Sequence, residues 1–133
     1  MTIYTVTVRE YELDSFGHVN NSVYLNYTEA AKWDFFRKTG MIDEIRKNDL
    51  FPVIMENNIR YLHELKSGDI VNITTDWKSS GRILRFDHVL INKTSEEISA
   101  KVKGKIMFID YNRVMQDIPD CIIKYLEAQN NGN

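Results

Sequence analysis

The segment from Asn21 to Gly40 most constrains what this chain can fold into, because it predicts one helix that is apolar around most of its circumference. Asn21 or Ser22 can cap the start of this helix, and Gly40 can end it. The apolar side chains are Val23, Tyr24, Tyr27, Ala30, Ala31, Trp33, Phe35 and Phe36. The remaining polar strip consists of Asn26, Glu29, Lys32 and Arg37. A helix with so narrow a polar strip should be largely enclosed by the rest of the fold.

Alternation of polar and apolar residues predicts strands on both sides of the helix. The expected strands cover residues 3–10, 53–65, 69–79, 82–93 and 97–110. Turn residues at 67–69, 79–81 and 94–96 separate the last four segments, which predicts consecutive antiparallel hairpins. In the last segment Lys101, Lys103 and Lys105 should face solvent. The residues expected to face inward there are Ile98, Ala100, Val102, Gly104, Ile106 and Phe108.

This order of elements predicts an α+β fold, in which an antiparallel five-stranded sheet wraps around a long central helix. A short polar helix is expected over residues 42–47 and a terminal helix over 117–128, with Asp117 as its cap and Pro119 in its first turn. Residues 129–133 should be a frayed tail. No composition shift divides the 133 residues, so we expect a single domain over residues 1–133.

Composition limits the classes of partner and site. A net charge of -2 gives no general field for nucleic acid or anionic membranes, so an anionic ligand needs a local positive patch. No basic leader and no run of ~20 apolar residues is present, and we expect a cytoplasmic protein. The single cysteine, Cys121, fits a reducing compartment and is expected to be a buried apolar residue. The three histidines are scattered and lack paired cysteines, so neither a metal nor a cofactor is expected.

The densest chemistry lies in the loop just before the long helix. Asp14, Gly17, His18, Asn20 and Asn21 fall within eight consecutive positions of this loop. Free backbone N–H groups and the positive end of the helix dipole collect at a helix N-terminus. A carboxylate there can act as base or nucleophile, while amides hold the negative oxygen that develops during acyl transfer. The loop therefore suits attack on a carbonyl carbon.

The pattern Asp14-x-x-Gly17-His18-Val19-Asn20-Asn21-x-x-Tyr24 resembles the signature of hotdog-fold thioesterases. The similarity is greatest to the branch of 4-hydroxybenzoyl-CoA thioesterase and the related plant acyl-carrier-protein thioesterases. Residues 56–61 followed by 65–69 also resemble the second strand of that family and the turn that ends it. The resemblance covers roughly residues 3–110. It departs from the family pattern at His63 and Glu64, where a relative often has proline.

The resemblance implies hydrolysis of acyl-CoA or acyl-carrier-protein thioesters, in fatty acid metabolism, to a free acid and a thiol. Asp14 would be the catalytic residue, either activating water or attacking the carbonyl itself. The N–H groups of His18, Val19 or Asn20 would polarise the carbonyl, and Gly17 would allow its close approach. The family is at least dimeric with sites between subunits, which implies a homodimer or homotetramer.

Several site residues have an alternative structural interpretation. Asn21 and Tyr24 either orient Asp14 or the acyl group, or serve as helix cap and core residue. His18 is a secondary candidate for a general base, although a loop histidine more often makes a structural hydrogen bond. Glu56 is a reserve catalytic carboxylate, and an ion pair with Arg60 is its alternative role.

Basic residues are candidates for contacts to the phosphates of coenzyme A, with solvation at the surface as their alternative. These candidates are Arg60, Lys78, Arg82 and Arg85, with Lys101, Lys103 and Lys105 as the next choice. At the level of the whole protein, a hotdog module that binds acyl-CoA for regulation without catalysis is the alternative function. A hotdog hydratase is less consistent with the motif. An aliphatic acyl group is expected rather than an aromatic one.

Overall fold

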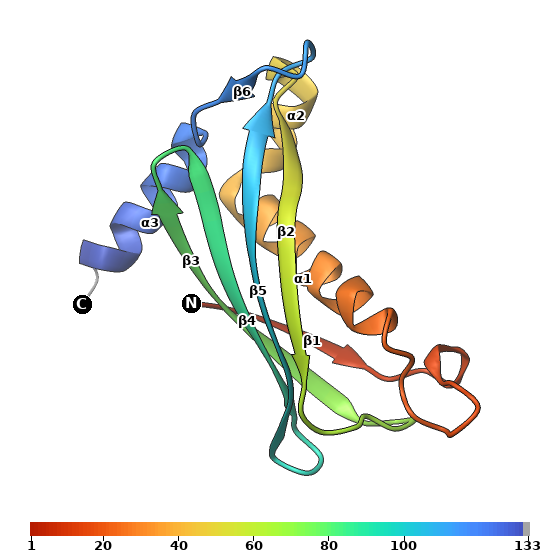
Figure 1. The fold of residues 1–133 in the computed structure, drawn as a ribbon. Coiled ribbons are helices and arrows are strands. Elements are labelled where there is room, and N and C mark those ends of the chain that lie inside the picture. Colours follow the sequence, from red (N-terminus) through yellow and green to blue (C-terminus); the bar gives the residue numbers. More distant parts are fainter. Residues whose placement is uncertain (132–133) are drawn as a thin grey trace.

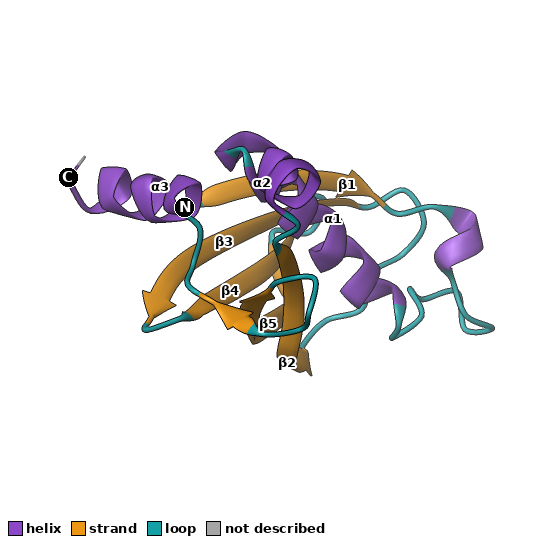
Figure 2. Ribbon diagram, turned by 90° about the horizontal axis from the view of Figure 1, so that it is seen from above, coloured by secondary structure: helices purple, strands orange, loops and turns teal. Residues whose placement is uncertain are grey.

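One antiparallel sheet with helices on one side forms the frame of the computed structural model, which describes residues 1–131 (Figure 1). The strands are β1 (Thr2–Thr7), β2 (Phe51–Tyr61), β3 (Ile70–Ser80), β4 (Ile83–Asn92), β5 (Glu97–Ile109) and β6 (Met115–Gln116). The helices are α1 (Val23–Thr39), α2 (Met41–Asn48) and α3 (Asp120–Asn131), with a 3₁₀ turn η1 (Glu10–Glu12). Seen from above, all three α-helices lie on the same side of the sheet (Figure 2). The expected α+β class is confirmed.

The strand order β1-β3-β4-β5-β2 differs from the expected succession of hairpins. The hairpins β3–β4 and β4–β5 form as predicted, but β2 pairs with β5 and not with β3. The reason lies in residues 62–69, where Leu65 is fully buried and its carbonyl accepts the N–H of Val19 at 2.9 Å. This segment contacts the loop before α1, and its tight turn at residues 66–69 leads from Lys66 into β3 without closing a hairpin between β2 and β3. The sixth strand, β6, was not expected and adds two residues beside β5.

Helix α1 begins and ends where the sequence predicts. It starts after Ser22 and ends at Gly40, whose φ of 85° suits glycine and whose N–H donates to two carbonyls of the last turn. The buried residues of α1 are Tyr24, Tyr27, Thr28, Ala31, Lys32, Phe35 and Phe36. One residue contradicts the expected polar strip, because Lys32 is only 6% exposed.

The core is centred on aromatic side chains between the helices and the sheet. The ring of Phe35 on α1 stacks on Trp77 of β3 with centroids 4.0 Å apart, and Tyr125 of α3 meets Phe35 edge-on at 5.1 Å. Gly104 of β5 makes room for the ring of Phe86 on β4, since a Cβ at residue 104 would lie 2.2 Å from that ring. Cys121, expected to be buried, is only partly buried at the margin of the core.

The terminal helix starts later than the sequence predicts. Asp117 does not cap it but forms an ion pair with Arg82 at 3.0 Å, and Pro119 precedes the first turn and accepts two backbone N–H groups. The expected fraying is also wrong for Gln129, which is helical and accepts a hydrogen bond from the terminal amino group of Met1 at 3.0 Å. Residues 132–133 of the expected tail lie outside the described residues.

Strand β5 shows the predicted alternation for most of its length, with Lys101 and Lys103 exposed and Lys105 partly exposed. Ile98 is the exception, because it is 38% exposed although it was expected inside. A register shift against β4 puts Ser99 in the interior instead, where its hydroxyl donates to the carbonyl of Leu90 at 3.1 Å. Among the residues that the structure describes, no helix is both long and apolar enough to cross a bilayer.

Candidate active site

A pocket of about 240 Å³ opens beside the N-terminal end of α1, where the loop before the helix meets the segment after β2. Its walls contain Asp14, His18, Val19, Asn21, Tyr24, Tyr61, Leu62, His63 and Glu64. Five of these residues belong to the sequence motif, so the fold assembles the motif residues around one hollow.

The Asp14 carboxylate is held through one of its two oxygens. Its Oδ1 accepts the backbone N–H of Phe16 at 2.9 Å and that of His18 at 3.2 Å. The backbone N–H of Asp14 donates to the carbonyl of His18 at 2.7 Å, and Gly17 between them adopts a φ of 81°. No hydrogen bond from residues 1–131 reaches the second oxygen, Oδ2. The loop therefore orients the carboxylate and leaves one oxygen available to a ligand.

The three amides expected to polarise a carbonyl are not free in this structure. The N–H of His18 donates to Asp14, that of Val19 to the carbonyl of Leu65, and that of Asn20 to the carbonyl of Glu12. These three hydrogen bonds hold the loop in place, so the three N–H groups are unavailable to a ligand. The next amide differs, because no described residue accepts the N–H of Asn21.

His18 joins the motif loop to the opposite wall of the pocket. Its Nε2 lies 3.2 Å from Oε2 of Glu64, and its backbone forms a short antiparallel bridge with Lys66. Glu64 also approaches Lys66, with 3.6 Å between Oε1 and Nζ. The imidazole therefore contacts a carboxylate on the far side of the pocket and links its two walls.

Tyr24 supplies a buried phenol at the base of the pocket. The residue is 3% exposed, and its ring meets Tyr61 edge-on with centroids 5.0 Å apart. Burial raises the pKa of the Tyr24 phenol, and the negative charges of Glu64 and Asp14 act in the same direction. The phenol thus stays protonated and keeps its ability to donate a hydrogen bond.

Sequence reasoning noted His63 and Glu64 as a departure from the family pattern but did not place the wall formed by residues 61–64 in the site. The Tyr61 hydroxyl donates to the carbonyl of Asn21 at 3.0 Å, and Leu62 is 43% exposed at the rim. His63 contacts Glu97 at the start of β5, with 3.2 Å between Nε2 and Oε2. A further sequence signal for this wall is Leu65, an apolar residue inside a polar turn, which anchors the segment in the core.

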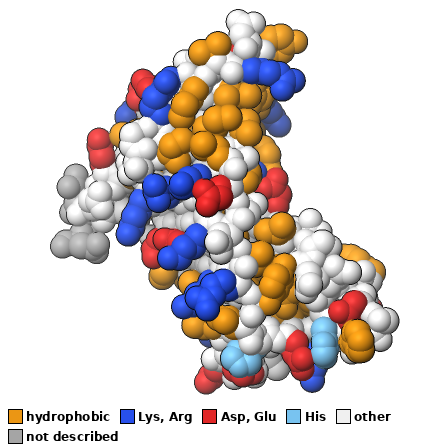
Figure 3. Space-filling model, in the orientation of Figure 1, with side chains coloured by type: hydrophobic (Ala, Val, Ile, Leu, Met, Phe, Trp, Pro, Cys, Tyr) orange, Lys and Arg blue, Asp and Glu red, His pale blue; other side chains and the backbone are white. Residues whose placement is uncertain are grey.

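Glu56, the reserve carboxylate, does not face the Asp14 pocket. It lines a separate hollow of about 500 Å³ on the outer face of the sheet and contacts Lys105, with 3.3 Å between Oε2 and Nζ. The expected ion pair with Arg60 is therefore replaced by one with Lys105, which is the neighbour of Glu56 in the register of β2 and β5. Figure 3 shows Lys and Arg side chains gathered over the sheet with acidic ones among them.

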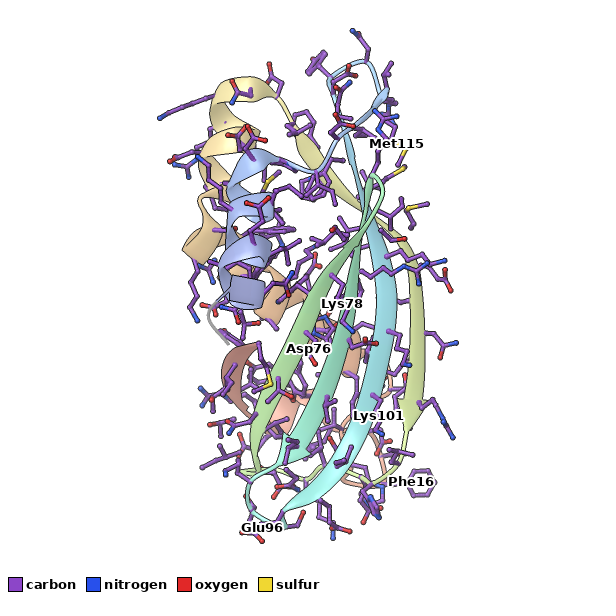
Figure 4. All side chains as sticks on the ribbon, turned by 90° about the vertical axis from the view of Figure 1, so that its left-hand side faces the viewer. Phe16, Asp76, Lys78, Glu96, Lys101 and Met115 are labelled. Carbon is purple, nitrogen blue, oxygen red and sulfur yellow. The ribbon has the colours of Figure 1, made fainter. Side chains whose placement is uncertain are left out.

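The four basic candidates for phosphate contacts do not form one group. Arg60 and Arg85 line the outer hollow, and Lys78 lies beside Arg85 in the register of β3 and β4. Arg82 is separate, because it contacts Asp117 and donates to the carbonyl of Met115. Met115 lies at the opposite end of the sheet from Phe16 in the motif loop (Figure 4). Within residues 1–131 no cluster of His, Cys, Asp and Glu has the arrangement of a metal site.

Comparison with known proteins gives consistent matches. The model of the thioesterase-like superfamily matches residues 8–126. The acyl-acyl carrier protein thioesterase ATL3 of Arabidopsis thaliana, a chloroplastic protein, is 34% identical over 118 residues, which are 86% of this chain and 62% of that protein. The long-chain acyl-CoA thioesterase FadM of Escherichia coli K12 is 31% identical over 70 residues, 53% of each chain. The chain thus spans less than two thirds of the length of these curated relatives.

Solved structures share the fold at low sequence identity. The DHNA-CoA thioesterase of Staphylococcus aureus superimposes with a TM-score of 0.84 over 99% of this chain and 95% of that one, at 18% identity. At this identity the match establishes the fold alone.

Proposed function

The chain belongs to the thioesterase-like superfamily, and from this premise we propose that it hydrolyses acyl-CoA or acyl-carrier-protein thioesters to a free acid and a thiol. The observation that carries the proposal is the free carboxylate oxygen of Asp14, held in a pocket at the start of α1. The names of the curated relatives support thioester substrates of both kinds, on acyl carrier protein and on coenzyme A.

Asp14 would carry the reaction through Oδ2. In one route this oxygen takes a proton from water and the water oxygen bonds to the carbonyl carbon. The C–S bond then breaks, and Oδ2 passes the proton to the leaving sulfur, which departs as the thiol. In the other route Oδ2 itself attacks the carbonyl carbon, the thiol leaves, and water then hydrolyses the resulting acyl-enzyme anhydride. Both routes need the carboxylate aimed at one point, and the two N–H bonds to Oδ1 provide that orientation.

The Asn21 amide is our candidate for the group that stabilises the developing oxyanion. Its N–H lies just before α1, where the helix dipole is positive, and residues 1–131 offer it no acceptor. Its position is fixed from the other side, because its carbonyl accepts the hydroxyl of Tyr61. This assignment replaces the three amides that the loop itself uses.

We also propose the hotdog arrangement, with α1 as the enclosed helix and a second copy of the chain against β2. Strand β2 is the last in the sheet, and along its other edge no described strand pairs with it. Met55 and Tyr61 on β2 and Leu62 after it are 49%, 46% and 43% exposed. The expectation of a dimer came from the family resemblance, and the position of β2 at the end of the sheet supports it. A homodimer or homotetramer in the cytoplasm remains our proposal.

The phosphates of the carrier would be held on the outer face of the sheet. Arg60, Arg85, Lys103 and Lys105 line the same hollow there, with Glu56 and Asp87 as the acidic members. Guanidinium groups suit phosphate because they donate two parallel hydrogen bonds. Arg82 is not part of this proposal, since its guanidinium is already bound by Asp117 and Met115.

Release of free thiol from a series of acyl-CoA substrates of increasing chain length tests the function. We expect turnover with at least one chain length, together with stoichiometric release of acid. Tight binding of acyl-CoA without release of thiol would overturn the hydrolase and favour the non-catalytic binding module.

A further inference from the structure

A second polar site lies between α1 and β2, away from the Asp14 pocket. It is a cavity of about 30 Å³, large enough for a small group such as a hydroxyl or a carbonyl oxygen. Its walls are formed by Leu25, Thr28, Glu29, Lys32, Ile54, Asn57, Phe86 and His88. None of these residues lines the Asp14 pocket, and the proposed hydrolysis assigns no role to any of them.

Lys32 brings a nearly buried ammonium group to this cavity. Its Nζ lies 2.6 Å from Oε1 of Glu29, whose side chain is 50% exposed, and 5.3 Å from the centroid of the Trp33 ring. An ammonium group has three protons to donate, and the carboxylate of Glu29 takes one of them. Lys32 therefore retains donor capacity in a place that water scarcely reaches.

His88 brings a neutral imidazole to the same cavity. The residue is 2% exposed, and burial lowers the pKa of His88 to about 3, with the positive charge of Lys32 acting in the same direction. Its Nδ1 lies 2.6 Å from the Thr75 hydroxyl, whereas no described residue bonds its Nε2. No fully buried polar side-chain atom among residues 1–131 lacks a hydrogen bond, so Nε2 keeps some accessible surface, and His88 lines the cavity.

Stability alone does not account for this pair of groups. Removing a charge from water costs free energy, and apolar side chains of similar volume usually serve at least as well in a core. Thr28 adds a third polar group, since its hydroxyl donates to the carbonyl of Leu25 and its oxygen can still accept. With Glu29 and Asn57, five polar side chains surround one small space, and they indicate a site for a polar atom of a ligand.

The cavity and the Asp14 pocket lie along the same face of α1 and the same face of β2. Tyr24, Thr28 and Lys32 are spaced by four residues, so they lie along one face of α1. On β2, Tyr61 and Asn57 share the inner face, because their partners on β5 are Ala100 and Gly104. At the usual rise of about 1.5 Å per helical residue, Lys32 lies about 12 Å beyond Tyr24 along the helix. An acyl chain that starts at Asp14 and follows α1 would reach the cavity with its far end.

We infer that the cavity between α1 and β2 binds a neutral oxygen, a hydroxyl or a carbonyl, on the far part of the acyl chain, and so selects oxygenated acyl thioesters over plain ones. This inference rests on the proposed hydrolysis at Asp14. A neutral oxygen fits better than a carboxylate because Glu29 already balances the charge of Lys32. Lys32 and Thr28 are specificity-determining residues in this account, and neither takes part in the reaction.

The test compares plain acyl-CoA with acyl-CoA of equal chain length that carries a hydroxyl on its last carbon. At the best chain length the wild type should prefer the hydroxylated substrate in kcat/KM by about tenfold or more, since a site built to hydrogen-bond an oxygen rejects an analogue that lacks it. Lys32→Met should remove most of this preference, and Thr28→Val should lower it in the same direction. Thermal melting shows that each variant is folded.

Lys38→Met is the matched control, because Lys38 lies on the same helix, pairs with Asp34 at 2.8 Å and is exposed. Lys38→Met should leave the preference for the hydroxylated chain unchanged. A second control is a substrate whose hydroxyl lies next to the thioester, at the Asp14 pocket, and Lys32→Met should not alter the turnover of this substrate relative to the plain one. Equal preference in wild type, Lys32→Met and Thr28→Val would overturn the inference while leaving hydrolysis intact.

Calorimetric binding of the two free acids makes the comparison independent of turnover. A Lys32-dependent preference in binding would support the site even if no thioester were hydrolysed, and its absence would overturn it.

Discussion

The two polar sites along α1 differ in burial, and the difference separates two kinds of role. Around the Asp14 pocket the carboxylate and residues 61–64 of the wall are exposed, whereas Val19 and Tyr24 are buried, and local hydrogen bonds hold the Asp14 carboxylate. Around the second cavity Lys32 and His88 are 6% and 2% exposed and come from a helix and a strand far apart in sequence. Exposed groups can be changed with little effect on folding, whereas buried ones affect stability and selectivity together. We therefore expect the first site to react and the second to select.

The largest expected effect is on turnover. Asp14→Asn should lower kcat by at least about a hundredfold, because general base or nucleophilic action contributes ~10²-fold or more. The amide oxygen of asparagine can still accept the N–H groups of Phe16 and His18, so the loop and the melting temperature should be retained. Asp43→Asn, at an exposed carboxylate on α2, is the control and should leave kcat unchanged. A folded Asp14→Asn enzyme with near-native turnover would exclude Asp14 as the reacting group.

The second effect is on stability and belongs to the buried site alone. The pKa of His88 is lowered from 6.5 to about 3 in the folded state, so below pH 6.5 the unfolded chain binds a proton that the folded chain does not. Stability should therefore fall as pH decreases from about 6.5 towards 3, by up to roughly 1.4 kcal/mol per pH unit from this group. The hydroxyl of Thr75 contacts the imidazole, and the charged groups that line the cavity with it are Lys32 and Glu29 of α1.

Urea unfolding of wild type and His88→Leu between pH 6.5 and pH 5 measures this contribution. The variant should show a shallower loss of stability over that interval, whatever its stability at neutral pH. Identical slopes would show that His88 takes up its proton in the folded state as readily as in the unfolded state.

A third change tests the packing beneath the cavity. In Gly104→Ala the new Cβ would lie 2.2 Å from the Phe86 ring and 2.4 Å from the carbonyl oxygen of Glu56, so both the ring and the backbone of β2 must move. The free energy of unfolding should decrease by about 1–3 kcal/mol. Phe86 also lines the cavity, so the preference for a hydroxylated chain should decrease too. Gly81→Ala, at a turn where no heavy atom lies within 4 Å, should leave that preference unchanged.

The smallest expected effect lies on the outer face of the sheet. Arg85→Ala should raise KM for acyl-CoA a few-fold with little change in kcat, because a phosphate contact binds substrate and transition state equally. The increase should shrink at high salt, and it should be absent for a pantetheine thioester without the nucleotide. Arg82→Ala is the matched control, since Arg82 is bound at the far end of the sheet. Equal effects of the two changes would place the carrier elsewhere.

The sequence predicts the exposed site better than the buried one for physical reasons. Asp14, Asn21 and Tyr24 lie close together in sequence, in the loop before α1 and in its first turn, so one local segment carries all three. The free amide could not be identified in advance, because which N–H groups the loop uses depends on contacts to Leu65 and Glu12. The helix and most strand boundaries follow from periodicity in the same way.

The buried site depends on long-range pairing that local patterns do not carry. The sequence assigns Lys32 to an exposed polar strip, and its burial follows only from the pairing of β2 with β5. No turn residues in the sequence distinguish this pairing from a hairpin between β2 and β3. The bulge between Ile54 and Glu56, which puts Asn57 on the inner face, is likewise invisible in the alternation. Sequence reasoning therefore found the candidate reactive group and missed the candidate selective one.

Measuring kcat/KM for plain and hydroxyl-ended acyl-CoA in wild type, Asp14→Asn and Lys32→Met tests the division of roles most directly. We predict that Asp14→Asn lowers both values by the same large factor and leaves their ratio unchanged, whereas Lys32→Met changes mainly the ratio. Two results would contradict this division of roles. In the first, Lys32→Met lowers both kcat/KM values as much as Asp14→Asn does. In the second, Asp14→Asn alters the ratio and leaves turnover of the plain substrate near the wild-type value.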